Sequence, residues 1–184
     1  ARCVCSSPVI LDRACQAFTA TWPLVSGASI RITSAASIAL SIFASQFSEL
    51  TGLSVGQLDA DPQLELVAAM NDGGVRWLAV NDSRTGQEQW LLEITEFEPR
   101  AVLAANVVGD SRSEVLVAQG LGQESIELRN SVDGALIWES EPLVGEELAP
   151  FGMAVANLDG DPAVEVLGVG AEQIGVFSTT GAKE

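Results

Sequence analysis

The stretch Asn157-Leu158-Asp159-Gly160-Asp161-Pro162-Ala163-Val164-Glu165 decides the interpretation of this chain. Oxygen-bearing side chains stand at every second position of its first half, at Asn157, Asp159 and Asp161, and Glu165 closes it. Alternation of this kind in a tight loop points several oxygens at one centre, and a hard cation such as Ca²⁺ takes about six to eight oxygen ligands. An apolar run follows at once, so we expect the loop to lead into a buried strand.

The same pattern occurs twice earlier in the chain. Residues 57–65 (QLDADPQLE) are a near copy, and residues 106–114 (NVVGDSRSE) are a degenerate one in which Val108 replaces an acid. The closing glutamates Glu65, Glu114 and Glu165 give a period of about 50 residues. An internal repeat of that length indicates a propeller, a solenoid or another repeat array.

Short strand-like segments joined by turn signals surround each acidic loop. Residues 71–74 (NDGG), for example, are typical of a hairpin turn. The predicted strands are 53–57, 64–69, 75–80 and 87–92 in the first unit, 100–106, 114–118, 125–128 and 135–138 in the second, and 153–157, 164–169 and 173–177 in the third. In the third unit the sequence ends at Glu184, where a fourth strand is expected to begin.

These segments predict an all-β fold. A single antiparallel sheet of four short strands cannot bury both of its faces, and radial stacking of such sheets, as in a β-propeller, buries them. We expect about three four-stranded antiparallel blades, incomplete as a ring, in residues 48–184, with blades at about 48–98, 99–147 and 148–184. Propellers close with about four to eight blades. The chain is therefore expected to be a fragment, to receive blades from partner chains, or to add strands from residues 1–47.

Two tryptophans occupy the same place in successive repeats. Trp90 and Trp138 each follow a turn glycine, Gly86 and Gly134, by four residues. We expect them to pack as wedges between neighbouring sheets, with stacking on a ligand as the alternative.

The N-terminal segment, residues 1–47, does not match the repeat. It is poor in charge, and residues 28–33 alternate like a strand, while periodicity does not decide between a helix and another buried segment for residues 34–47. Three cysteines, Cys3, Cys5 and Cys15, lie here, and a disulfide from Cys15 to either partner is compatible with export. The uncharged run 32–47 is short and rich in serine, so we predict no transmembrane helix. The chain begins at Ala1 without Met, as a mature product or a piece of a longer polypeptide would.

The charge distribution limits the classes of function that the chain can have. The net charge is −16, and residues 48–184 hold 24 acids against six bases. Such a region repels nucleic acid and anionic lipid and attracts cations, although an acidic surface also serves plain solubility. The chain has no His, no Tyr and one Lys, Lys183. Catalysis would therefore rest on carboxylates, Ser or Cys.

The repeated loop, the strand before it and the later G-x-x-x-W turn together resemble FG-GAP/VCBS repeats, the blades of integrin-α-like β-propellers. The resemblance covers roughly residues 50–184. In that family the loop between the first two strands of a blade binds Ca²⁺ through alternate side chains, one backbone carbonyl and a closing acid.

Carried over by position, the resemblance implies a set of Ca²⁺ ligands in each loop. They are Gln57, Asp59, Asp61, the carbonyl of Gln63 and Glu65 in the first; Asn106, Asp110, the carbonyl of Arg112 and Glu114 in the second; and Asn157, Asp159, Asp161, the carbonyl of Ala163 and Glu165 in the third.

The chain departs from the family after the third ligand, where the family has a bending Gly. Pro62, Ser111 and Pro162 stand there instead, and proline fixes φ near about −65°. Acid-rich turns are also ordinary solvated turns. Against that alternative, three crowded carboxylates repel one another unless a cation offsets the repulsion.

These observations together predict a calcium-binding recognition, adhesion or scaffold module that is not an enzyme and that acts outside the cytoplasm, either extracellular, at the cell surface or periplasmic. Weak calcium sites are useful where free Ca²⁺ is abundant. The expected partners are a protein or glycan ligand or further blades of the same assembly, with no nucleic acid and no membrane insertion. The alternative is the propeller part of a polysaccharide lyase or hydrolase. Asn81-Asp82-Ser83 also matches a glycosylation sequon.

Overall fold

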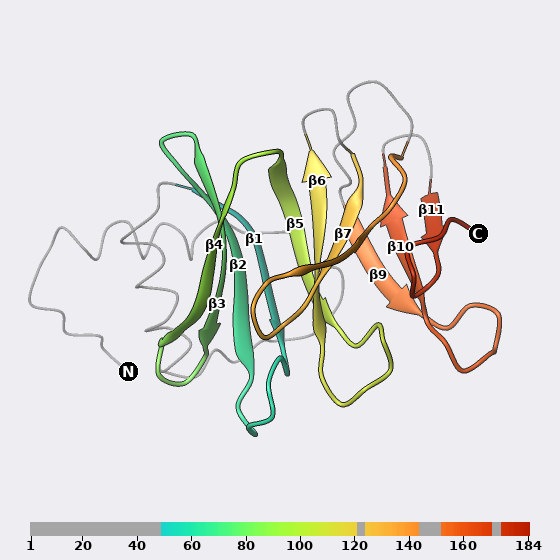
Figure 1. The fold of residues 1–184 in the computed structure, drawn as a ribbon, viewed down its shortest axis with the longest axis horizontal. Coiled ribbons are helices and arrows are strands. Elements are labelled where there is room, and N and C mark those ends of the chain that lie inside the picture. Colours follow the sequence, from blue (N-terminus) through green and yellow to red (C-terminus); the bar gives the residue numbers. More distant parts are fainter. Residues whose placement is uncertain (1–48, 121–123, 144–151, 171–173) are drawn as a thin grey trace, which may run out of the picture.

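The computed structural model describes residues 49–120, 124–143, 152–170 and 174–184 as an all-β arrangement of three sheets set side by side (Figure 1). Within these ranges there are eleven strands and no helix. The strands are β1 (Glu49–Gly56), β2 (Glu65–Asp72), β3 (Val75–Asp82), β4 (Glu88–Ile94), β5 (Glu98–Ala105), β6 (Glu114–Gly120), β7 (Ile126–Arg129), β8 (Leu136–Glu139), β9 (Gly152–Ala156), β10 (Glu165–Val169) and β11 (Ile174–Phe177).

Each sheet is an antiparallel meander in which sequence neighbours pair. We call β1–β4 blade one, β5–β8 blade two and β9–β11 blade three. Blade three has three strands, and the segment after β11 returns to it through one bridge between Phe177 and Lys183. The predicted fold class is therefore confirmed: blades of four, four and three strands are stacked without closing a ring. Within the described ranges, no helix has the length and apolar character needed to cross a membrane.

The turns explain why the strands begin and end where they do. Gly73 and Gly74 join β2 to β3 with φ values of 60° and 94°. Two positive φ values in a two-residue loop match the twist of the flanking strands, and glycine adopts them without a steric penalty. Side chains alternate across each strand, so one face of a blade meets the next blade.

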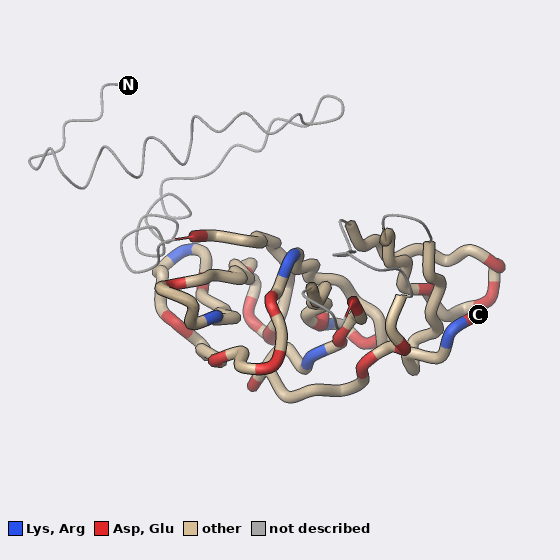
Figure 2. The backbone as a smooth tube through the Cα atoms, turned by 90° about the horizontal axis from the view of Figure 1, so that it is seen from above, with Lys and Arg blue, Asp and Glu red and all other residues tan. Residues whose placement is uncertain are grey.

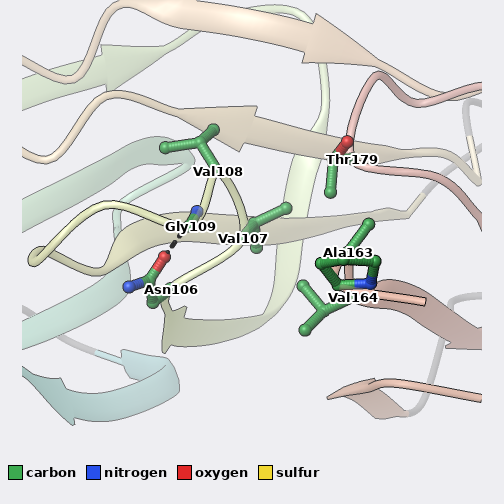
Figure 3. Close-up of a pocket in the computed structure, with 8 residues that line it drawn as sticks. Asn106, Val107, Val108, Gly109, Ala163, Val164 and Thr179 are labelled. Carbon is green, nitrogen blue, oxygen red and sulfur yellow. Dashed lines mark hydrogen bonds between the residues drawn. The ribbon is translucent and has the colours of Figure 1, made fainter. Parts of the chain in front are cut away.

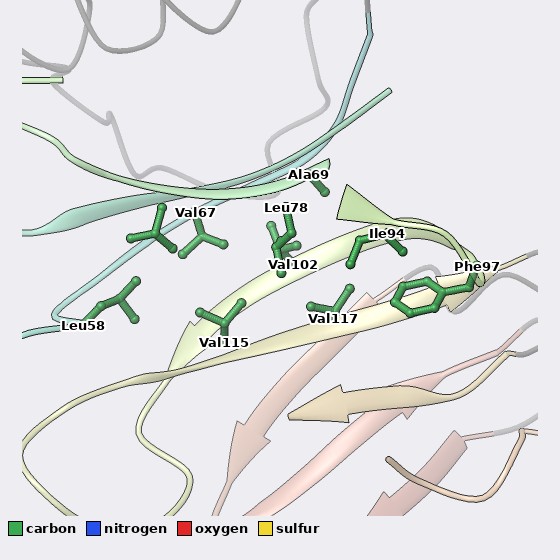
Figure 4. Packing of buried hydrophobic residues seen from close by; sticks show 10 residues of the cluster. Leu58, Val67, Ala69, Leu78, Ile94, Phe97, Val102, Val115 and Val117 are labelled. Carbon is green, nitrogen blue, oxygen red and sulfur yellow. The ribbon is translucent and has the colours of Figure 1, made fainter. Parts of the chain in front are cut away.

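The first core lies between blades one and two (Figure 4). Apolar side chains of the two facing sheets interdigitate there, among them Val67 and Leu78 from blade one and Val115 and Val117 from blade two. Each of these side chains is fully buried. Full burial of a Val or Leu side chain stabilises a fold by about 1.5–3 kcal/mol. A second core between blades two and three holds the side chains of Val107, Leu116, Ile126, Leu128, Leu143, Val166 and Phe177.

The two repeat tryptophans join neighbouring blades. Trp90 at the end of blade one donates its indole N–H to the Ser131 carbonyl of blade two at 2.7 Å. Trp138 of blade two makes the same bond to the Thr179 carbonyl of blade three at 2.8 Å. The prediction of packing wedges is confirmed, and the sequence did not indicate that each indole also forms a hydrogen bond.

The segment 1–47, its cysteines and its strand lie outside the described residues. The division of the chain into that segment and the blades at about 48–98, 99–147 and 148–184 therefore stays a prediction. Asn81 of the possible sequon is buried, and its amide donates to the Gly86 carbonyl at 3.2 Å, so the folded chain does not present this side chain at its surface.

Candidate metal-binding loops

All three acidic loops lie at the same end of the stack, the lower end in Figure 1, because each joins the first strand of a blade to the second. The turns between the third and fourth strands lie at this end too. Asp82 in the first of these turns accepts bonds from the Thr85 hydroxyl and backbone N–H at 2.7 and 2.5 Å, and the hydroxyl bond above all holds the pKa of Asp82 below its ordinary value. Figure 2 shows acids distributed along the backbone of every blade.

The closing glutamate of each loop has a second role that the sequence did not indicate. Its Oε2 accepts a hydrogen bond from the backbone N–H seven positions earlier. Glu65 accepts from Leu58 at 2.6 Å, Glu114 from Val107 at 2.8 Å and Glu165 from Leu158 at 2.5 Å. These glutamates are all buried. Each one therefore fastens the start of its loop to the first residue of the following strand.

The amide side chain at the first ligand position of each loop forms hydrogen bonds across the loop. Asn157 donates from Nδ2 to the carbonyls of Asp161 and Ala163, the latter at 3.0 Å, while its Oδ1 accepts from Gly160 N at 2.7 Å. Asn106 bridges its loop in the same way. Gln57 bridges the first loop through the Asp59 and Asp61 carbonyls. These amides presently act as donors toward the loop centre, whereas the resemblance assigns them as oxygen ligands.

The bend of the loop falls earlier than in the family pattern. Gly109 and Gly160 adopt φ values of 81° and 87°, and each stands just before the third ligand position. Pro62 and Pro162 keep negative φ, so the backbone does not need a left-handed residue there. The proline substitution is therefore compatible with these loops.

Carboxylates gather in two of the three loops. In the first, one oxygen each from Asp59, Asp61 and Glu65 lie within 4.8 Å of one another. In the third, Asp159, Asp161 and Glu165 meet the same condition. Within the described residues the second loop forms no such group, because Val108 occupies an acid's place.

Hydrogen bonds already orient these carboxylates. Asp61 Oδ1 accepts from Gln63 N at 2.7 Å, and Asp161 Oδ1 accepts from Ala163 N at 2.7 Å. In the second loop Asp110 Oδ1 accepts from Arg112 N at 2.7 Å. Asp59 accepts from Asp61 N at 2.8 Å and from the Gln89 amide at 2.9 Å. Each aspartate keeps lone pairs for a cation while it stabilises the turn.

Glu65 differs from the other two closing glutamates. Its side chain is fully buried, and its Oε1 has no hydrogen-bond partner. Burial raises the pKa of Glu65 above 4.5, the Leu58 N–H opposes that rise, and the nearby Asp59 and Asp61 charges add to it. A buried carboxylate oxygen without a partner costs free energy unless a proton or a cation satisfies it. The donor set of the first loop therefore fits a hard, oxygen-seeking ion.

A pocket of about 360 Å³ opens between the second and third loops (Figure 3). Its lining is mostly apolar and includes Val107, Val108 and Val164. The matching place between blades one and two is bridged by hydrogen bonds, one from Ser113 N to the Gln57 carbonyl and one from Ser131 Oγ to the Leu58 carbonyl, both at 2.7 Å. The two blade junctions are thus unequal at the loop end.

These features define the class of the molecule as consecutive blades of a β-propeller with acidic inter-strand loops. No protein-family model matches the chain, and no curated protein matches it. A solved structure of BamB from Moraxella catarrhalis is similar at 24% identity and a TM-score of 0.47, over 73% of this chain and 35% of that one. The rhamnogalacturonan lyase PL11 of Bacillus licheniformis is similar at 14% identity and a TM-score of 0.40, over 73% and 30%. Both are β-propeller proteins, and this chain spans about a third of the length of each.

Proposed function

We propose that the chain is a calcium-binding propeller module for recognition or scaffolding outside the cytoplasm, and that the first and third loops hold the ions. The observation that carries the proposal is the buried, unpartnered Oε1 of Glu65 beside Asp59 and Asp61. Asp159, Asp161 and Glu165 would hold the second ion.

The choice of ion follows from the donors. All three groups of each cluster are carboxylates, and hard oxygen donors select Ca²⁺ or Mg²⁺ over soft metals. Mg²⁺ demands near-ideal octahedral geometry at about 2.0–2.1 Å, whereas Ca²⁺ accepts irregular cages. A loop that is already constrained by an amide clamp and two side-chain–backbone turns favours the more tolerant ion. The expected affinity is in the range of extracellular modules, with Kd of about 10⁻⁴–10⁻³ M.

The expected effect of the ion on stability can be calculated. For a site with Kd of about 0.2 mM, about 2 mM free Ca²⁺ stabilises the native state by roughly 1.4 kcal/mol. Two such sites give about 2.8 kcal/mol, which raises the melting temperature of a chain of this size by about 6–11 °C. The module would work outside the cytoplasm because only there is free Ca²⁺ high enough to fill such sites.

The test is thermal unfolding of the full chain in CaCl₂, in MgCl₂ and with a chelator. Asp61→Asn and Asp161→Asn each keep the Oδ1 that accepts the turn N–H, so they remove charge with the turn intact. We expect each to abolish about half of the Ca²⁺-dependent rise, and the double variant to abolish all of it.

The matched control is Asp72→Asn, which removes an exposed acid at the end of β2, outside both clusters. It should leave the Ca²⁺ response unchanged. The proposal fails if Ca²⁺ and chelator leave the melting temperature unmoved, or if Asp72→Asn lowers the response as much as Asp61→Asn does.

A further inference from the structure

The two blade junctions differ at the loop end, and the difference leaves one of them open. Between blades one and two, Ser113 N donates to the Gln57 carbonyl and Ser131 Oγ donates to the Leu58 carbonyl, both at 2.7 Å. These bonds hold blade two against the first loop. Between blades two and three the same place is occupied by the pocket of about 360 Å³.

The first of these bonds has no counterpart at the open junction. Val164 stands one residue before its closing glutamate, as Ser113 does, and Asn106 corresponds to Gln57. Within the described ranges, no hydrogen bond joins Val164 N to the Asn106 carbonyl. A main-chain donor and a main-chain acceptor that pair at the first junction are thus unpaired at the second, and both residues line the pocket.

The second bond is missing in the same way. Thr179 corresponds to Ser131, because the carbonyl of each accepts the indole N–H of a repeat tryptophan. Val107 corresponds to Leu58 in its loop. In the part of the chain that the structure describes, the Thr179 hydroxyl does not donate to the Val107 carbonyl, and both of these residues also line the pocket.

The side chains around the pocket are apolar and small. The eight described residues that line it include no charged and no aromatic side chain. Val108 lies on one wall, where it is 49% exposed, and Ala163 and Val164 lie on the other (Figure 3). The volume is near the lower end of the range of about 300–1,000 Å³ for ligand pockets. An aliphatic side chain fits this lining, whereas a sugar ring would lose hydrogen bonds of its hydroxyls there.

Acids flank the apolar lining on both sides. Asp110 directly follows Gly109 on one wall, and Asp161 directly precedes Pro162 on the other, and both acids are exposed. The second and third loops, residues 106–114 and 157–165, hold five acids and one base, a net charge of −4, which one Ca²⁺ in the third loop would bring to −2. Such a rim attracts a cationic partner with or without the ion and repels anionic lipid.

We propose that this pocket binds an extended, basic segment of a partner protein through one aliphatic anchor side chain. The main chain of the anchor residue would pair with Val164 N–H and the Asn106 carbonyl, and flanking Lys or Arg side chains would lie beside Asp110 and Asp161. Main-chain hydrogen bonds then supply affinity, and the pocket selects the anchor. The inference rests on the recognition role proposed above and names its partner, but it does not require an ion in either loop.

The two repeat tryptophans provide a site-specific assay by nuclear magnetic resonance of the full chain. The Trp138 indole N–H donates to the carbonyl of the pocket residue Thr179 at 2.8 Å, whereas Trp90 makes the same bond at the closed junction. The probe is the peptide acetyl-KKLKK-amide. We expect it to shift the Trp138 indole resonance saturably, with a Kd of about 1 mM or below, and to leave the Trp90 resonance in place.

Two changes test the anchor. Replacing the leucine of the peptide by glycine should weaken binding by about 10–100-fold, because the burial of its side chain is lost. Val108→Phe fills the pocket from its own wall and should weaken binding by at least about tenfold. The matched control is Val75→Phe, at a 40% exposed position in the turn region at the opposite end of the stack, which should leave the Kd unchanged within about twofold.

Four outcomes would overturn the inference. They are no saturable shift of Trp138 up to about 5 mM peptide, equal binding of the glycine peptide, unchanged binding to Val108→Phe, and tighter binding of decanoate than of the peptide. The last would identify a lipid-like chain as the occupant. Should Val108→Phe not fold, the glycine peptide decides, because that comparison leaves the protein unchanged.

Repeating the titration in CaCl₂ and in chelator separates this inference from the ion sites. Binding should persist in chelator, because the rim is then more negative. Peptide binding in a chain whose melting temperature ignores Ca²⁺ would support this inference and reject the ion sites. A Ca²⁺ response without peptide binding would do the reverse, and binding that occurs only with Ca²⁺ would contradict the charge argument and overturn the inference.

Discussion

The contact between Trp90 and Gly134 allows a quantitative test of how the blades are joined. Gly134 adopts φ of 72° in the turn between β7 and β8, and an added Cβ would lie 3.2 Å from Trp90 Cζ3. Gly134→Ala therefore combines two costs. The left-handed backbone costs an L-residue about 1–2 kcal/mol. Overpacking against a well-packed ring adds about 1–3 kcal/mol.

Gly109→Ala separates these two costs. Gly109 has a similar φ of 81°, but nothing lies within 4 Å of its added Cβ. We expect Gly109→Ala to lower the free energy of unfolding by about 1–2 kcal/mol. Gly134→Ala should lower it by about 2–5 kcal/mol, which corresponds to a fall of roughly 4–20 °C in melting temperature.

Urea unfolding followed by tryptophan fluorescence and by circular dichroism measures both variants. The difference should shrink in a Trp90→Leu background, where the ring is absent, since contacting residues are energetically coupled. If Gly134→Ala and Gly109→Ala agree within about 0.5 kcal/mol, the ring does not press on the turn and this account of the blade junction is wrong.

Three further predictions follow from the contacts described above. Trp138→Phe keeps a six-membered aromatic ring but removes the pyrrole ring and, with it, the 2.8 Å hydrogen bond to the Thr179 carbonyl, so unfolding by urea should show a loss of at least about 1–2 kcal/mol. Val108→Asp restores the missing carboxylate of the second loop, and the Ca²⁺-dependent rise in melting temperature should grow by about half in thermal scans. Burial raises the pKa of Glu127 above 4.5 despite its 2.6 Å ion pair with Arg129. The folded chain therefore holds this proton more tightly than the unfolded chain. The stability that this bound proton contributes is fully present below the pKa that Glu127 has in the unfolded chain. It is lost as the pH rises through the pKa that Glu127 has in the folded chain. Glu127→Gln should flatten this dependence in urea titrations between about pH 4 and about pH 7.

Most of the fold could be predicted from the sequence because its signals are local. Gly73 and Gly74 mark a turn by backbone freedom, and the alternation of apolar residues marks the strands. The fifty-residue period then implies stacking, because a lone meander leaves a face uncovered. The assignment to FG-GAP/VCBS repeats stays a prediction, since no family model matches the chain.

The candidate site was less accessible to prediction because one residue type serves several purposes. The sequence pattern predicts that Asn157 is an oxygen ligand, yet its side-chain amide donates to two carbonyls of the loop. The sequence pattern predicts that Glu65 is a metal ligand, yet one of its carboxylate oxygens accepts a hydrogen bond from Leu58 N–H. Which atom of a side chain faces the loop centre depends on the folded backbone, and the sequence pattern does not contain that information. The ion itself stays a prediction for all three loops.

The glutamate that fastens each loop makes the shape of the loop independent of the acids at its exposed positions. The second loop has lost a carboxylate, but Glu114 still binds Val107 N and Asn106 still spans the turn. Losing or gaining an exposed acid therefore leaves the backbone of the loop in place, and the number of acids can differ from one blade to the next. Engineers could use the same property to install other chemistries at this rim by exchanging only the exposed positions between the fixed ends.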